Sequence, residues 1–400
     1  MAGARGGAIW FTAGQLLISG CTFTRNRASS IGGAVCLEEI GGTIINSNFI
    51  ENASGGYAGT LAYMPIFSGT PLTLDNATFI NNSAEGSAGA VYARPRWPVT
   101  ITNTIFINNS ASEAGAVQLY NRITLTVINC SFTDNKAIVG PRQCNPANSR
   151  GGAIIAGGEV WCIGSNFTRN AAYSDGGAIS LQDDFYSEKC TFTNNSAFAG
   201  SGGVIYGTRR QTTVLIVEST FSYNTALFCG VADMLTDAEG YRYNLTIMSS
   251  LFMYNGATDN TTVTGGGGVA CIRNASISVT CSAFSHNTAA QHAGVFYINN
   301  SVITVEVSLF MNNTAAGDGG VMYTNASSHM ISGSIFSRNS AGGDGGATFI
   351  RMANSQARVE KSMFSHNNVT DQGRAYYVSS SALMIHGTNF MEIPTTLVGL

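Results

Sequence analysis

The chain has 400 residues, a formal net charge of −3 and only 11% charged residues, well below the roughly 25% of an ordinary soluble domain. Its basic residues are scattered, which argues against a nucleic-acid partner, because nucleic-acid binding needs a basic patch or stripe. No apolar run approaches the ~18 residues of a transmembrane helix, and the N-terminal MAGARGGAIWF lacks the apolar core of a signal peptide.

From residue 23 onward, the chain repeats a Phe followed three residues later by an Asn. The spacing between successive Phe residues is mostly 25 to 32, with 26 the commonest and one value of 35. Self-similarity at such a period is the signature of a repeat architecture. The thirteen pairs are Phe23/Asn26, Phe49/Asn52, Phe79/Asn82, Phe106/Asn109, Phe132/Asn135, Phe167/Asn170, Phe192/Asn195, Phe221/Asn224, Phe252/Asn255, Phe284/Asn287, Phe310/Asn313, Phe336/Asn339 and Phe364/Asn367; Phe390 starts a fourteenth copy that lacks the Asn.

A second anchor, usually GGA or GGV, follows each Phe by about ten residues, as at Gly319 and Gly345. The segments between anchors are short alternating runs of Val, Ile, Thr, Phe and Ser, which are typical of strands. No segment has an apolar 3.6-residue period long enough for a helix. The sequence therefore predicts an all-β, right-handed parallel β-helix solenoid of about fourteen coils, forming one continuous unit over residues 1–400.

In such a stack, equivalent residues of neighbouring coils lie over one another about 4.8 Å apart. We expect the Phe residues to form an inward aromatic stack and the Gly pairs to form turns with positive φ or close backbone approach. The asparagines are predicted to form a hydrogen-bonded ladder at an inside bend. Its members would be Asn26, Asn52, Asn82, Asn109, Asn135, Asn170, Asn195, Asn224, Asn255, Asn287, Asn313, Asn339 and Asn367.

The pairing of F-x-x-N with GG[AILV] resembles the repeat of chlamydial polymorphic outer membrane proteins and related right-handed β-helix proteins. The resemblance covers nearly the whole chain. It implies a right-handed coil and a surface-exposed, often adhesive passenger region. It implies no catalytic site, because the motif residues of that family are architectural.

The first coil starts inside a repeat, and the last one, GTNFMEIPTTLVGL, has no clear cap. Solenoids need capping units, since uncapped coils present naked strand edges. Two explanations follow: the sequence is part of a longer chain, or open ends stack on other copies of the protein to make a filament.

The nine cysteines contain no C-x-x-C pair, so a zinc site or a redox dithiol is not indicated. Cys21, Cys130 and Cys190 lie two residues before their Phe, where each is either a small buried apolar group or half of a disulfide. Cys144, in the insertion before Gly151, is the best disulfide candidate.

Fourteen N-x-S/T sequons would be N-glycosylation candidates in a secreted eukaryotic protein. In the phrase F-x-N-N-S/T the sequon Asn precedes the ladder Asn, and strand alternation would point Asn81, Asn108, Asn194 and Asn312 outward. The candidates are Asn52, Asn76, Asn81, Asn108, Asn129, Asn166, Asn194, Asn244, Asn260, Asn274, Asn299, Asn312, Asn325 and Asn368.

β-Helices also include polysaccharide lyases and hydrolases, which need paired carboxylates or a Ca²⁺ cluster on neighbouring coils. The best carboxylate column is Asp175, Asp318 and Asp344, with Asp371 close to register. The simpler interpretation is that each Asp caps its own turn. His286 and His366 occupy a variable exposed position, so we assign neither of them to catalysis. The sequence predicts no catalytic residue, no metal site and no cofactor.

We therefore predict a secreted or cell-surface structural or adhesive β-helix rod and not an enzyme, with a carbohydrate-active enzyme as the alternative. Its partners would be other copies of itself or flanking chain segments, and a glycan or cell-surface receptor. Because loops vary without disturbing a stacked core, specificity is predicted to lie in three insertions. These are Val139 to Arg150, Thr236 to Tyr243 and Thr258 to Thr264.

Overall fold

A computed structural model describes residues 5–39, 41–65, 70–139, 146–208, 213–235, 243–260, 266–351, 356–379 and 381–391. It forms an all-β parallel β-solenoid of about 13 turns, which confirms the predicted fold class and repeat. Among the described residues, the one helical segment is the short 3₁₀ turn η1 (Pro146–Asn148). No helix of the described part is long and apolar enough to cross a membrane. Cys144 and most of the three predicted specificity loops lie outside the described residues.

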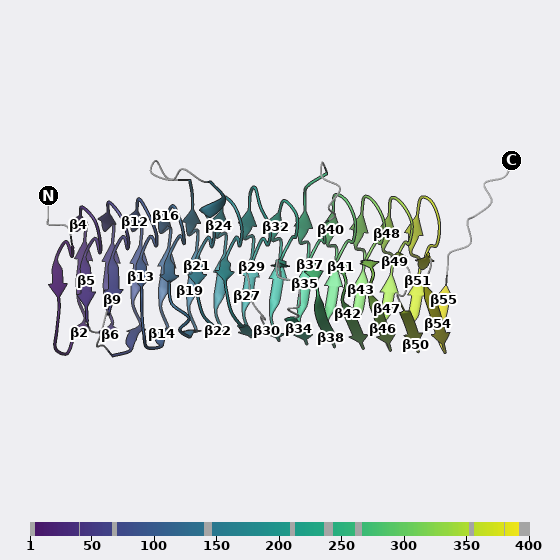
Figure 1. The fold of residues 1–400 in the computed structure, drawn as a ribbon, viewed down its shortest axis with the longest axis horizontal. Helices are drawn as coiled ribbons and strands as arrows, with labels where there is room; N and C mark the ends of the chain where they lie inside the picture. Colours follow the sequence, from purple (N-terminus) through teal and green to yellow (C-terminus); the bar gives the residue numbers. More distant parts are fainter. Residues whose placement is uncertain are drawn as a thin grey trace. The chain divides into compact units, whose positions relative to one another are not determined.

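The chain divides into two compact units, one of residues 1–227 and 231–243 and one of residues 228–230 and 244–400. In both units a coil contributes one strand to each of four parallel sheets, called here sheets 1 to 4 in chain order (Figure 1). Sheets 1 to 3 have strands of three to six residues, whereas sheet 4 has strands of two.

Unit 1 contains the following strands. Sheet 1 has β1 (Ile9–Phe11), β5 (Val35–Glu38), β9 (Leu61–Met64), β13 (Val91–Ala93), β17 (Val117–Leu119), β21 (Ile154–Ala156), β25 (Ile179–Leu181), β29 (Ile205–Thr208) and β33 (Ala232–Leu235). Sheet 2 has β2 (Leu17–Ser19), β6 (Gly42–Ile45), β10 (Leu72–Asp75), β14 (Val99–Thr102), β18 (Leu125–Ile128), β22 (Val160–Ile163), β26 (Phe185–Glu188) and β30 (Thr213–Val217). Sheet 3 has β3 (Thr22–Thr24), β7 (Asn48–Ile50), β11 (Thr78–Ile80), β15 (Ile105–Ile107), β19 (Ser131–Thr133), β23 (Asn166–Thr168), β27 (Thr191–Thr193) and β31 (Thr220–Ser222). Sheet 4 has β4 (Arg27–Ala28), β8 (Ala53–Ser54), β12 (Ser83–Ala84), β16 (Ser110–Ala111), β20 (Lys136–Ala137), β24 (Ala171–Ala172), β28 (Ser196–Ala197) and β32 (Thr225–Ala226).

Unit 2 contains the remaining strands, of which β34 (Tyr243–Met248) starts at the boundary residue. Its sheet 1 has β37 (Ala270–Arg273), β41 (Phe296–Asn299), β45 (Met322–Asn325), β49 (Thr348–Arg351) and β53 (Tyr376–Val378). Sheet 2 continues with β38 (Ala275–Thr280), β42 (Val302–Glu306), β46 (Ser328–Ser332), β50 (Gln356–Glu360) and β54 (Ala382–His386). Sheet 3 has β35 (Leu251–Met253), β39 (Ala283–Ser285), β43 (Leu309–Met311), β47 (Ile335–Ser337), β51 (Met363–Ser365) and β55 (Asn389–Met391). Sheet 4 has β36 (Gly256–Ala257), β40 (Thr288–Ala289), β44 (Thr314–Ala315), β48 (Ser340–Ala341) and β52 (Asn368–Val369).

Sheet 3 holds the predicted aromatic column. In unit 1, for example, Phe49 pairs with Phe79 in register, and the two rings lie 4.8 Å apart at an interplanar angle of 6°. In unit 2, Phe284 and Phe310 stack in the same way at 4.9 Å and 5°. Because these rings are buried and repeat at the strand spacing, each of these coils places its Phe ring directly on that of the coil before.

Where another coil follows, glycine is required at the second position of the repeated Gly pair. A Cβ at Gly33 would collide with the backbone carbonyl of Gly59 on the next coil, and one at Gly89 would collide with that of Gly115. The first position tolerates another residue at a conformational cost, since Ala58 and Ala88 occupy it with φ values of 55° and 60°. The pair therefore combines a left-handed turn with a close backbone contact.

Candidate functional site

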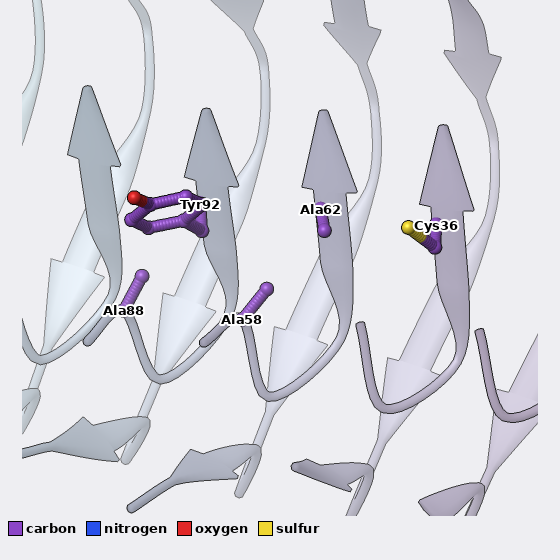
Figure 2. Close-up of a cluster of buried hydrophobic side chains, with 5 residues drawn as sticks. All are labelled: Cys36, Ala58, Ala62, Ala88 and Tyr92. Carbon is purple, nitrogen blue, oxygen red and sulfur yellow. The ribbon is translucent and has the colours of Figure 1, made fainter. Parts of the chain in front are cut away.

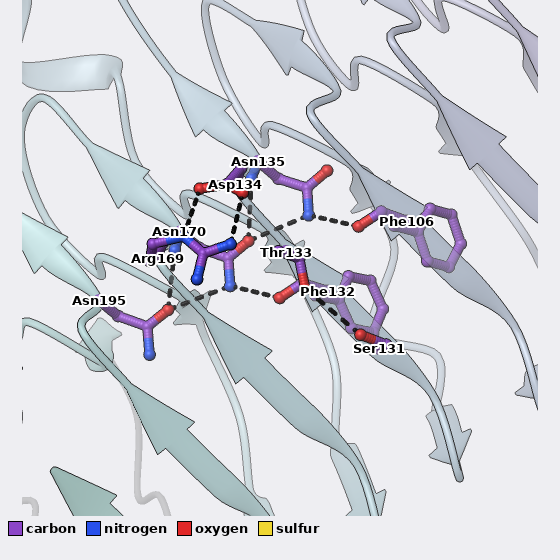
Figure 3. A network of polar contacts seen from close by, with 9 residues as sticks. All are labelled: Phe106, Ser131, Phe132, Thr133, Asp134, Asn135, Arg169, Asn170 and Asn195. Carbon is purple, nitrogen blue, oxygen red and sulfur yellow. Dashed lines mark hydrogen bonds and ion pairs between the residues drawn. The ribbon is translucent and has the colours of Figure 1, made fainter.

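The ladder asparagines hold three coils together at each step (Figure 3). Asn135 donates from Nδ2 to the carbonyl of Phe106 on the preceding coil at 3.0 Å and to Oδ1 of Asn170 on the following coil at 3.0 Å. The backbone N–H of Asn135 also donates to Oδ1 of Asn170, at 3.1 Å. Asn170 repeats the pattern with Phe132 and Asn195. The carboxamide thus satisfies backbone groups that the bend would otherwise leave unpaired.

The same arrangement extends through each unit. In unit 1 it is seen from the first member, where Asn26 donates to Asn52, and in unit 2 it runs to Asn339, which donates to Asn367. Twelve of the thirteen predicted ladder asparagines are buried, eleven of them fully, and Asn26 is partly exposed. The buried members are Asn52, Asn82, Asn109, Asn135, Asn170, Asn195, Asn224, Asn255, Asn287, Asn313, Asn339 and Asn367.

The residue before each ladder Asn has a left-handed backbone conformation. Asn81, Asn108 and Asn194 have φ values of 55°, 51° and 55° and are exposed, and Asn312, also at 55°, is partly exposed. Asn adopts this conformation more readily than most residues do. The outward direction of these side chains therefore comes from the left-handed bend and not from the strand alternation assumed from the sequence.

One sequon prediction is wrong, because Asn52 is fully buried. Its Nδ2 donates to the Phe23 carbonyl and to Asn82 Oδ1, so the nitrogen that would carry a glycan lies inside the ladder. The other candidates are exposed or partly exposed. The exposed ones are Asn76, Asn81, Asn108, Asn129, Asn166, Asn194, Asn244, Asn260 and Asn368, and the partly exposed ones are Asn274, Asn299, Asn312 and Asn325.

A second ladder, which sequence reasoning missed, occupies the position two residues before each Phe. In unit 2 the N–H of Ser282 donates to Ser308 Oγ at 3.2 Å, and the N–H of Ser308 donates to Ser334 Oγ at 3.1 Å. Each hydroxyl also donates to the carbonyl two residues earlier, as Ser308 does to Glu306 at 2.8 Å. The recurrence of Ser, Thr and Cys at this position was the signal that could have revealed it.

Cysteines enter the same ladder in unit 1. The N–H of Cys130 donates to Ser165 Oγ at 3.0 Å, and the N–H of Ser165 donates to Cys190 Sγ at 3.4 Å. Cys130 and Cys190 are buried free thiols, and burial raises the pKa of Cys130 to about 11. Cys21, at the same position, is a free and exposed thiol. The disulfide that the structure shows joins two other cysteines, Cys229 and Cys271 of unit 2.

The predicted carboxylate column is a series of turn caps. Asp318 Oδ1 accepts the N–H of Asp344 at 2.9 Å, and Asp344 Oδ1 accepts that of Gln372 at 2.9 Å. We had expected each Asp to cap its own turn. Instead, each side chain caps the turn of the next coil. Asp371 is one residue out of register, while Asp175 in unit 1 caps Ser201 in the same way, at 2.9 Å.

His292 takes the place of the carboxylate one coil before Asp318. Its Nδ1 accepts the N–H of Asp318 at 2.9 Å, so that nitrogen carries no proton. Burial lowers the pKa of His292, which also favours the neutral ring. The contact of 3.5 Å between Nδ1 and Asp318 Oδ2 is therefore not an ion pair. Within the described ranges, no three His, Cys, Asp or Glu side chains come together as a metal site.

The outer face of sheet 1 in unit 1 changes its chemical character from one coil to the next. The central residues of its strands pair in the order Cys36, Ala62, Tyr92 and Gln118. Figure 2 shows the apolar part of this face, where Cys36, Ala62 and Tyr92 lie on the strands and two turn alanines lie beside them. The column then becomes polar at Gln118, where a cavity of about 230 Å³ opens.

That cavity, called here the sheet 1 pocket, lies over β17, β21 and β25. Its polar lining includes Gln118, which is 3% exposed and whose Oε1 has no hydrogen-bond partner among the described residues. At the rim Tyr120 is 54% exposed. The full lining is Glu113, Gln118, Leu119, Tyr120, Asn148, Arg150, Ile155, Ala156, Gly157, Ser180 and Gln182.

Comparison with known proteins agrees with the repeat architecture. Residues 20–38, 76–94 and 189–208 each match the Chlamydia polymorphic membrane protein repeat. Each stretch begins at the left-handed residue three positions before a Phe, at Gly20, Asn76 or Lys189, and runs through the ladder Asn and the turn into a sheet 1 strand. The resemblance inferred from the motif is therefore confirmed over these stretches. A search of curated proteins found no match.

Proposed function

We propose that the chain is a surface-displayed passenger region with a structural and adhesive role. The observation that carries this proposal is that the inward and the outward residues of a coil have different roles. The repeated Phe, Asn, Ser and Gly residues hold coils to one another, whereas the outward positions differ from coil to coil. Arg25, Glu51 and Asn81, for example, occupy the same left-handed position on successive coils. The match to a membrane-protein repeat supports display at a cell surface.

The outward positions also support contact with a large partner. Exposed aromatic side chains occur on them, such as Trp161, which is 41% exposed and packs against Tyr186 with ring centres 4.7 Å apart. Aromatic residues are enriched in the contact surfaces of proteins. End-to-end assembly belongs to the same proposal, because a coil of a second copy could accept the hydrogen bonds that one coil gives to the next.

Polysaccharide cleavage is the less favoured alternative. Its best candidates, Asp318 and Asp344, each have Oδ1 engaged by a backbone N–H of the next coil. This is the use expected of a structural cap, since a catalytic carboxylate needs its oxygens directed at substrate.

Binding of the purified chain to cultured cells and to immobilised glycans tests the proposal. We expect saturable binding by the folded chain and none by the heat-unfolded chain. Electron microscopy of material from the source organism tests assembly, for which continuous filaments with ~4.8 Å coil spacing are expected. Release of soluble sugars from polysaccharides by the chain, without adhesion, would overturn the adhesive role in favour of the enzyme.

A further inference from the structure

We propose that the sheet 1 pocket of unit 1 binds one neutral sugar unit of a glycan. The inference rests on the proposed contact function and names the chemistry of one contact. Its central observation is Gln118, a polar side chain almost completely buried at the floor of a cavity, with its acceptor Oε1 unpaired. Burying a polar group without a hydrogen bond is costly, so such a group indicates a ligand that supplies the missing donor.

The ligand must provide hydrogen-bond donors at more than one point. Besides Gln118, the lining contains the carboxylate of Glu113, which accepts the hydroxyl of Ser87 at 3.3 Å and has further acceptor capacity. The exposed carboxamide of Gln182 adds both a donor and an acceptor. Neighbouring hydroxyl groups, each both donor and acceptor, fit this set.

The charges around the pocket favour a neutral ligand over an acidic one. Arg150 is the basic residue of the lining, and its Nε lies 3.3 Å from Asp175 Oδ2 and donates to the Ala147 carbonyl at 3.1 Å. Its guanidinium also covers the ring of Tyr206, 5.4 Å from the centroid. With Arg150 paired in this way, Glu113 is the remaining charged group of the lining, and the cation of Arg94 lies outside the lining, over the Tyr120 ring. Inside the pocket an acidic sugar would therefore meet the Glu113 carboxylate, with the one basic residue of the lining already paired to Asp175.

Tyr120 provides an apolar surface of the size of a pyranose ring. Arg94, on the β13 side, lies over the Tyr120 ring at 4.9 Å from its centroid. Apart from the residues on and beside β17, the lining comes from the coils on the other side of Tyr120, namely from η1, β21, β25 and the segments next to them. At about 230 Å³ the cavity is smaller than the roughly 300–1,000 Å³ of drug-sized sites, which favours one sugar unit over a chain of several.

Saturation-transfer NMR with the intact chain tests this inference. The probes are glucose, galactose, mannose and N-acetylglucosamine, each offered alone, with glucuronic acid as the charged comparison. We expect at least one neutral sugar to bind and glucuronic acid to bind more weakly than glucose. The substitutions Gln118→Leu and Tyr120→Ala should each weaken binding by roughly tenfold or more. The control Trp10→Ala changes an exposed aromatic residue on β1, several coils away from the pocket, and should leave binding unchanged.

Thermal stability separates a ligand-binding Gln118 from a structural one. Gln118→Leu removes an unpaired buried polar group, so stability should stay level or rise while sugar binding is lost. Unchanged sugar binding in both pocket variants, or no binding by any neutral sugar, would overturn the inference. Cell adhesion that persists in the pocket variants would leave the proposed function standing without the pocket. If the unmodified chain does not adhere to cells, the proposed adhesive function is itself overturned.

Discussion

At the scale of single residues, one side chain departs from the repeat chemistry of unit 2. His329, on β46, points into the core between Ile303 and Ala357 on the neighbouring coils and is 3% exposed. Neither ring nitrogen has a hydrogen-bond partner within the described residues, and the ring centre lies 5.9 Å from that of Tyr376. Burial lowers the pKa of His329 to about 4 from an ordinary value of 6.5.

This depressed pKa predicts acid sensitivity. Above pH 6.5 the ring is neutral in both the folded and the unfolded chain, so stability does not depend on it. Between pH 6.5 and 4 only the unfolded chain takes up the proton, so the free energy of unfolding falls by about 3 kcal/mol over this range. Denaturant unfolding of the His329→Leu variant should show a gain in stability that is larger at pH 4 than at pH 7.5. The exposed His366→Gln serves as control, and an equal gain at both pH values would contradict the prediction.

At the scale of structural elements, the asparagine ladder offers a matched comparison of adjacent residues. Asn109 is fully buried, bonded to Phe79 and Asn135, and accepts from the N–H and the Nδ2 of Asn82. Asn108, next to it, is exposed and left-handed at φ 51°.

Asn109→Ala should lower the free energy of unfolding of unit 1 by about 4 kcal/mol, since it leaves several buried groups unpaired at ~1–3 kcal/mol each. Asn108→Gly should change it by less than about 1 kcal/mol, because glycine adopts the left-handed conformation freely. Guanidinium unfolding followed by circular dichroism measures both. Similar losses for the two variants would mean that the ladder contributes little beyond the bend.

The element scale also shows where sequence patterns suffice. The Phe and Gly anchors predict the coil and its stacking, because each depends on one side chain or on the lack of one, repeated at a fixed spacing. The Ser ladder was missed because Cys130 and Ala77 interrupt the series of hydroxyl residues in the sequence. Ala77 still takes part through its backbone, since its N–H donates to Thr104 Oγ1 at 3.3 Å. The pocket at Gln118 could not be predicted. It forms because one coil has a polar residue at this position and because residues of the next two coils lie beside it.

At the scale of the whole molecule, the two units differ in whether their described cysteines form a disulfide cross-link. The Cys229–Cys271 disulfide joins two residues of unit 2 that are 42 positions apart in the sequence, whereas the cysteines that the structure describes in unit 1 are free thiols. In the chain-entropy account, a loop of this length contributes about 4 kcal/mol by restricting the unfolded chain.

Reduction should therefore destabilise unit 2 selectively. Hydrogen exchange with mass spectrometry, with and without a reducing agent, should show faster exchange in peptides from residues 244–400 and little change in those from residues 5–208. The Cys229→Ser variant should reproduce the effect of the reductant, and adding reductant to it should have no further effect. The control Cys162→Ala, at a buried free thiol, should not reproduce the effect of the reductant. An equal loss of protection in both regions would contradict the prediction.

The reach of each ladder carboxamide, one coil back and one coil forward, has a consequence for how such a chain changes over time. Each ladder side chain contacts only the coils next to its own, so the ladder does not determine how many coils the chain has. A duplication or deletion of one whole repeat would restore the same contacts at the new junction, whereas loss of a ladder Asn within a repeat would break them. Coil number is thus free to vary in whole steps, while the anchor residues of each coil stay the same.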